Sequence, residues 1–166
     1  RVPAALPVEA RVEPGGVANR TILVAEDNPV NQKITTKFLD KIGVQWRLVG
    51  NGQEAVEAYR NGEIDLILMD VQMPIMDGLE ATTAIRRLEV LSETHIPIVA
   101  LTANVLEDDR NQARCAGFDD YLVKPIKTEE LELTIRKWIT RGQHSVASSE
   151  PAQLLRESDQ LSDLAR

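Results

Sequence analysis

The 166-residue sequence has no apolar run approaching the roughly 20 residues that a membrane-spanning helix requires. Its first residues also lack the basic, apolar and small-residue order of a signal peptide, so we expect a cytoplasmic segment. Cys115 is the only cysteine, which excludes a disulfide within the chain. We expect its thiol to be a small buried apolar group rather than a reactive one.

Basic residues are not in excess either. The formal net charge is −7, and it arises within residues 21–140, which hold 20 acidic and 13 basic residues. An acidic domain is poorly suited to bind nucleic acid or anionic lipid, so we predict neither as a direct partner. The apolar fraction of 43% suffices for the core of about one domain.

Composition divides the chain into three parts. Residues 1–20 contain several prolines and glycines without a sustained apolar period, which predicts a linker. Residues 21–140 form the predicted domain. Residues 141–166 are polar and predict either a linker or a short helix that includes Leu154, Leu161 and Leu164.

Five short β-like runs alternate with helical patterns between residues 21 and 140. The runs cover 22–25, 46–49, 66–69, 98–101 and 121–123, and four are nearly continuously apolar, as is typical of strands covered on both faces. Helices are predicted from Pro29 to the residue before Gly43, after Asn51-Gly52, after Asp77-Gly78, from about Val105 to Ala116 and from Thr128. In the first of them Val30, Ile34, Phe38 and Ile42 recur every four residues. Strand-then-helix units predict an α/β fold with a parallel sheet and helices on both faces.

Polar groups stand where four of these runs end. They are Glu26 with Asp27, Asp70, Thr102 and Lys124. Ligands of such sheets bind beyond the carboxyl ends of the strands, so these groups are expected to share one crevice. Like charges at one sheet edge are costly without a cation, and oxygen ligands from Asp27 and Asp70, aided by Glu26 through water, suit Mg²⁺.

A carboxylate beside a metal and an ammonium group can act as a nucleophile toward phosphorus. Asp70 would form the acyl phosphate, while Lys124 would neutralise charge on the phosphoryl group. The Thr102 hydroxyl would then donate to a phosphate oxygen. A donor in a movable loop converts a local change of charge into a conformational change.

The motifs closely resemble the response-regulator receiver domain of two-component signalling, over about residues 20–140. The resemblance is carried by Glu26-Asp27-Asn28, the stretch from Met69 to Gly78, Leu101-Thr102-Ala103-Asn104 and Lys124-Pro125. The stretches 26–32 and 100–104 are similar to the receivers of hybrid sensor histidine kinases. The resemblance implies a flavodoxin-like receiver fold with a five-stranded parallel sheet of order 2-1-3-4-5.

The resemblance also implies a role for each matched residue. Asp70 would be the phosphoacceptor, the metal would be held by Glu26, Asp27, Asp70 and the backbone carbonyl of Gln72, and Lys124 would pair with the phosphate. Thr102 and Tyr121 would form the switch, and the side chains of Gln72 and Asn104 would set the phosphoryl lifetime. A cis peptide is expected at Lys124-Pro125. Asp77 is interpreted separately, as a helix N-cap.

The chain itself lacks a phosphodonor. His95 and His144 do not stand in the amphipathic helical setting of a phosphodonor histidine, and there is no Gly-rich ATP site. The resemblance therefore implies a phosphohistidine donor, either a histidine kinase or a histidine phosphotransfer domain. It would dock near the helix from Pro29 to Lys41, where Ile34, Thr35 and Phe38 could supply apolar contacts. The parent would be a hybrid kinase, and tethering to an inner-membrane sensor kinase is compatible with a cytoplasmic domain.

Three other functions compete with this interpretation. A haloacid-dehalogenase type phosphatase needs a second aspartate two residues after the nucleophile, where this chain has Gln72. A flavodoxin-like cofactor carrier needs a phosphate-binding loop after the first strand, where Glu26 and Asp27 would repel phosphate. A receiver-like module that binds partners without phosphorylation stays open as the alternative. Oligomeric state, and whether self-phosphorylation makes this an enzyme, are not decided by the sequence.

Overall fold

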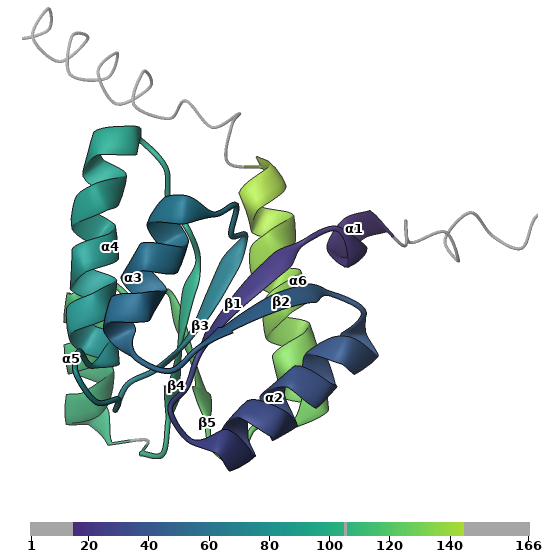
Figure 1. The fold of residues 1–166 in the computed structure, drawn as a ribbon, viewed down its shortest axis with the longest axis horizontal. Helices are drawn as coiled ribbons and strands as arrows, with labels where there is room; N and C mark the ends of the chain where they lie inside the picture. Colours follow the sequence, from purple (N-terminus) through teal and green to yellow (C-terminus); the bar gives the residue numbers. More distant parts are fainter. Residues whose placement is uncertain (1–14, 105, 145–166) are drawn as a thin grey trace, which may run out of the picture.

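The computed structural model describes residues 15–104 and 106–144 (Figure 1). The strands are β1 (Thr21–Ala25), β2 (Gln45–Val49), β3 (Leu66–Asp70), β4 (Ile98–Thr102) and β5 (Asp120–Val123). The helices are α1 (Gly15–Ala18), α2 (Pro29–Ile42), α3 (Gly52–Asn61), α4 (Gly78–Ser92), α5 (Glu107–Ala116) and α6 (Thr128–His144). Each predicted strand and helix of the domain is present, with ends that differ by a few residues.

The strands form one parallel sheet in the order β2-β1-β3-β4-β5, which confirms the expected topology. Two apolar clusters lie on opposite faces of this sheet. One packs α2 and α6 against residues such as Ile22 and Val24, and the other packs α3, α4 and α5 against Leu23 and Ala25. Helices therefore cover both faces, as Figure 1 shows.

Burial separates the central strands from the edge strands. All five residues of β3 are buried, as are nearly all of β1 and β4, because helices pack on both sides of them. The expectation of two-sided cover was wrong for 121–123. In β5 only Leu122 is buried, because this strand has a neighbour on one side only and a three-residue run contains too little periodicity to reveal it.

Helix α2 begins and ends where its capping residues predict. The Asn28 side chain accepts hydrogen bonds from the backbone N–H groups of Val30 and Asn31, and Gly43 ends the helix with a φ of 90°. The buried face, however, carries Thr35 and Leu39. The prediction that Thr35 offers a contact to a partner was therefore wrong, because Thr35 is buried, whereas Phe38 packs against the core with only part of its surface and its predicted contact stays a prediction.

The predictions for Cys115 and for the ends of the chain can also be compared with the structure. Cys115 is exposed, which overturns its expected burial, because the predominantly polar α5 places this position on its outer face. Within the predicted linker, α1 forms and Val17 packs against the core. The leucines proposed for a C-terminal helix lie outside the described residues. None of the helices in the described ranges combines the length and apolar character that a membrane span needs.

A charged network closes the sheet end where the strands begin. The Arg86 guanidinium contacts the carboxylates of Glu89 and Asp119 at 2.8 and 2.7 Å, and it donates to the backbone oxygens of Ile96 and Gly117. His95 Nε2 lies 2.7 Å from Asp119. Because Glu89 is only 5% exposed, its charge depends on Arg86 for compensation. The network ties α4 to the segments that enter β4 and β5.

Asp120 attaches α6 to the start of β5. Its carboxylate accepts hydrogen bonds from Trp138 Nε1 at 2.9 Å, from Lys137 Nζ at 3.2 Å and from the Tyr121 backbone N–H at 2.9 Å. Burial alone would raise the pKa of Asp120, but these bonds and the Lys137 charge together lower the pKa below its ordinary value. The ionised form therefore contributes to folding stability.

We expect Asp120→Asn to reveal this contribution through its pH dependence. A lowered folded-state pKa stabilises the fold above the ordinary carboxyl pKa of about 4, and this stabilisation is lost as the pH falls through the folded pKa. The wild-type advantage in unfolding free energy should hold near pH 7 and shrink below about pH 4. Urea unfolding across pH measures it. Glu57→Gln is the control, since Glu57 is exposed. A difference in unfolding free energy between the wild type and Asp120→Asn that does not change with pH would contradict the stabilising role of the ionised Asp120.

Candidate active site

The carboxyl ends of four strands place the predicted functional residues together. Glu26 follows β1, Asp70 is the last residue of β3, Thr102 is the last residue of β4, and Lys124 follows β5. Two backbone bonds fix these ends, from Glu26 N to Val49 O at 3.1 Å and from Lys124 N to Thr102 O at 2.8 Å. The Lys124-Pro125 peptide is cis, as expected. The parallel register therefore produces the crevice that the sequence predicts.

Lys124 bridges two of the acidic residues. Its Nζ lies 2.8 Å from Glu26 Oε2 and 2.9 Å from Asp70 Oδ2, and these carboxylates are 1% and 8% exposed. Burial alone would lower the pKa of Lys124, but the hydrogen bonds and the attraction of both carboxylates raise the pKa above its ordinary value. The ammonium group thus stays charged and supplies one compensating charge to the site.

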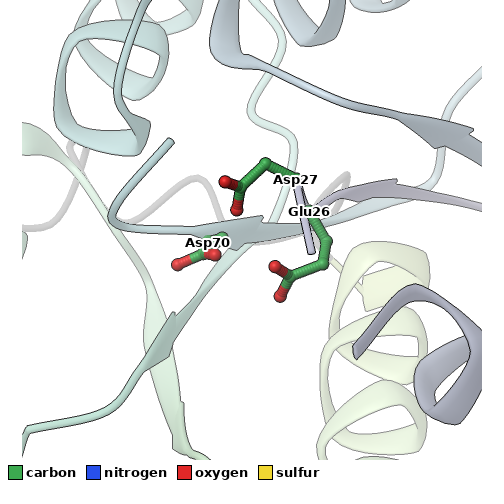
Figure 2. Close-up of side chains that lie close together, drawn as sticks. All are labelled: Glu26, Asp27 and Asp70. Atoms are coloured by element: carbon green, nitrogen blue, oxygen red, sulfur yellow. The ribbon is translucent and has the colours of Figure 1, made fainter. Parts of the chain in front are cut away.

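Three carboxylates converge above the sheet edge. One oxygen each from Glu26, Asp27 and Asp70 lie within 4.8 Å of one another, and Figure 2 shows the first two side chains leaving the end of β1 beside the third. The three carboxylates and one ammonium leave two formal negative charges. In the described part of the chain, no hydrogen bond or ion pair engages the Asp27 carboxylate, which is exposed. This donor set fits a divalent cation with a preference for oxygen.

Asp70 is held firmly by its own loop. Its Oδ1 accepts the backbone N–H of Gln72 at 3.1 Å, and the residue is 5% exposed. Gly78 packs directly against the Asp70 backbone, where a Cβ atom would overlap the carbonyl oxygen. Asp77 caps α4 and forms a reciprocal capping box with Glu80, which confirms its expected structural role. The loop from 70 to 78 is therefore closed at both ends.

The two expected switch residues are engaged away from Asp70. The Thr102 hydroxyl donates to the backbone oxygen of Asn104 at 2.9 Å and accepts its N–H at 3.1 Å. Tyr121 is 38% exposed, and the Arg110 guanidinium lies 4.7 Å from the centre of its ring. In this state, neither side chain makes a hydrogen bond to Asp70 within the described residues.

One cleft of about 910 Å³ contains every predicted site residue in its lining. These residues are Glu26, Asp27, Asp70, Gln72, Thr102, Asn104, Tyr121 and Lys124. The cleft continues past the β4–α5 loop along α5, beside Ala113 and Phe118. Its floor is acidic and its rim combines amide and apolar groups, so it suits an anionic group that arrives with a cation.

Sequence reasoning missed several contacts around the cleft. Arg110 carries no signal of its position over Tyr121, because the two residues lie in different elements. Gln32, whose side chain donates to the Glu26 backbone oxygen at 2.7 Å, belongs to the stretch 26–32 that the resemblance singled out. Its position in that stretch is a signal that could have drawn attention to Gln32, although no spacing rule predicts the hydrogen bond to Glu26.

Comparison with known proteins identifies the family. Residues 22–136 match the response regulator receiver domain. The chain belongs to this family. This receiver domain is 46% identical over 125 residues to hybrid signal transduction histidine kinase B of Dictyostelium discoideum, covering 70% of the chain and 6% of the kinase. It is 35% identical over 164 residues to the response regulator SSK1 of Verticillium dahliae, covering 75% and 20%.

Two solved structures resemble the receiver domain closely. The receiver domain of the sensor histidine kinase PA1611 from Pseudomonas aeruginosa, with magnesium coordinated in its active site cleft, is 42% identical with a TM-score of 0.68. The match covers 74% of this chain and 99% of that one. The co-crystal structure of the Saccharomyces cerevisiae proteins Ypd1 and Ssk1, the latter as its receiver domain, matches with 34% identity and a TM-score of 0.69, covering 81% and 96%.

We expect Gly78→Ala to destabilise the receiver domain by about 1–3 kcal/mol, the usual cost of forcing an extra group into a packed site. The added methyl would push against the backbone of Asp70. Urea unfolding gives the difference in free energy. Gly50→Ala is the matched control, because its nearest neighbour would be Glu54 Oε2 at an ordinary 3.8 Å. Equal unfolding free energies of the two variants would show that the loop from 70 to 78 accommodates the added methyl group without loss of stability.

Proposed function

We propose that this receiver domain accepts a phosphoryl group from a phosphohistidine onto Asp70, with Mg²⁺, and then switches conformation or passes the group on. The observation that carries the proposal is the acidic cleft in which Lys124 bridges Glu26 and Asp70 beside Asp27. In this proposal the receiver domain is part of a larger hybrid sensor histidine kinase. The domain lies in the cytoplasm, and the kinase is anchored in the inner membrane. The Dictyostelium relative supports the kinase context.

The residues divide the chemistry among them. An Asp70 carboxylate oxygen would bond to phosphorus as the phosphorus–nitrogen bond to the donor imidazole breaks, giving an acyl phosphate and a free histidine. Lys124 already contacts this carboxylate and would neutralise an added phosphate oxygen. The Thr102 hydroxyl would exchange its bond to Asn104 for one to phosphate, which would move the β4–α5 loop. Water held near Gln72 and Asn104 would later hydrolyse the phosphoryl group slowly.

Glu26, Asp27, Asp70 and the backbone carbonyl of Gln72 would hold the metal. The donor chemistry fits, because three carboxylate oxygens converge and leave two formal negative charges after Lys124 is counted. When bound, Mg²⁺ supplies charge neutralisation and orientation for the phosphoryl oxygens. The magnesium in the cleft of the PA1611 receiver domain supports this part of the proposal.

The donor is proposed to dock around the mouth of the cleft. Exposed apolar side chains stand on three segments that border it, namely Val30 and Ile34 on α2, Ile75 in the β3–α4 loop and Leu106 before α5. Ile75 has a φ of 69°, an unusual conformation for a β-branched residue, and is 78% exposed. The Ypd1 complex with the Ssk1 receiver domain supports a histidine phosphotransfer protein as partner.

We expect Mg²⁺ and a small phosphodonor such as acetyl phosphate to add about 80 Da, one phosphoryl group, to the wild type. Asp70→Asn should abolish the addition, as should chelation of the metal. Intact-mass spectrometry reads out both. Asp77→Asn is the matched control, since asparagine also caps helices and should leave labelling unchanged. Persistent labelling of the Asp70 variant would identify a different nucleophile. An unlabelled wild type would favour the phosphorylation-independent interaction module.

We expect Ile34→Asp to slow phosphoryl transfer from phosphorylated Ypd1 by about tenfold or more, the effect of a lost apolar anchor in an interface. Acetyl phosphate labelling should stay at the wild-type rate, because the small donor needs no docking surface. Val90→Asp is the control, because it makes the same kind of change at an 80% exposed residue near the C-terminal end of α4. Rates come from quenched-flow transfer assays. A loss with both donors would indicate damage to the cleft instead.

A further inference from the structure

Glu26 is held by several neighbouring residues, through hydrogen bonds and an ion pair. Its backbone N–H bonds to Val49 O at 3.1 Å, its Oε1 accepts the Asn28 N–H at 3.1 Å, and its Oε2 lies 2.8 Å from Lys124 Nζ. Its backbone oxygen accepts the Gln32 side chain at 2.7 Å. The residue next to it, Asp27, is exposed, and its carboxylate has no such partners within the described residues. The site thus combines one immobilised acid with one free acid.

The Gln32 bond acts on Asp27 through the peptide that joins the two acids. The Glu26 carbonyl and the Asp27 N–H belong to one planar unit, so a donor that fixes the carbonyl direction also limits the orientation of Asp27. Gln32 is itself held in the first half of α2, where its backbone N–H bonds to Asn28 O at 2.9 Å. Through this bond, helix α2 restrains the backbone that carries the exposed Asp27.

We propose that Gln32 is a positioning residue for the metal site: its amide holds the Glu26–Asp27 peptide so that the Asp27 carboxylate stays within reach of Asp70. This inference rests on the proposed function, because it concerns Mg²⁺ binding at that site. Mg²⁺ demands near-ideal octahedral geometry, whereas Ca²⁺ tolerates irregular sets of oxygens. A loosened Asp27 should therefore weaken Mg²⁺ more than Ca²⁺.

The test compares Gln32→Met with the wild type by isothermal titration calorimetry of Mg²⁺ and of Ca²⁺. Methionine keeps the length of the side chain and its lack of charge but removes the donor. We expect the Kd for Mg²⁺ to rise about fivefold, the factor that corresponds to one ordinary hydrogen bond, and the preference for Mg²⁺ over Ca²⁺ to fall. Gln53→Met is the matched control, because Gln53 is an exposed glutamine in the first turn of α3.

Thermal unfolding in EDTA separates positioning from support of the fold. A Gln32→Met variant that melts earlier yet keeps the wild-type Kd and metal preference would overturn the proposal, and so would an unchanged Kd at unchanged stability. Gln32→Ala serves as a second donor-free variant if the methionine variant does not fold. A wild type that binds neither ion would instead refute the proposed metal site, so the two failures are distinguishable.

Discussion

The contact of one ammonium group with two buried carboxylates governs the arrangement of this cleft. Lys124 lies within 2.9 Å of both Glu26 and Asp70, which come from the ends of two adjacent strands. Without it, two largely buried acids would repel each other at the edge of a sheet whose interior is apolar. Because the lysine follows β5, on the far side of β4, the contact also draws three strand ends and the cis peptide after Lys124 into one unit.

The sequence predicts the fold well because the relevant signals are local. Most strands are short apolar runs, and three helix starts are marked by the capping residues Asn28, Asn51 and Asp77, all of which accept backbone N–H groups in the structure. Their order along the chain then limits the topology to a parallel sheet. The convergence of Asp27, Asp70, Thr102 and Lys124 in one cleft follows from that topology, so it too was predictable.

The errors have a common cause, which is that burial depends on neighbours distant in sequence. Cys115 is small and apolar, yet α5 leaves it exposed. Thr35 is polar, yet it faces the core while Ile34 beside it is 40% exposed. Likewise the stacking of Arg110 on Tyr121 and the Arg86 network depend on the packing of separate elements. The proposed catalytic roles rest on matched motifs, since no pattern of spacing distinguishes a nucleophile from a structural aspartate.

The path of the chain has a practical consequence. The sheet is parallel, so β1 runs from its start at Thr21 toward the cleft, and α6, which begins at Thr128 shortly after Lys124, runs back to the opposite end. The short helix α1 contacts α6 there, as Figure 1 also shows. Entry into the domain and exit from it are thus neighbours on the side away from the acidic floor. An affinity handle, a fluorophore or an immobilising surface attached at Gly15 or His144 would leave the mouth of the cleft open to the proposed phosphodonor.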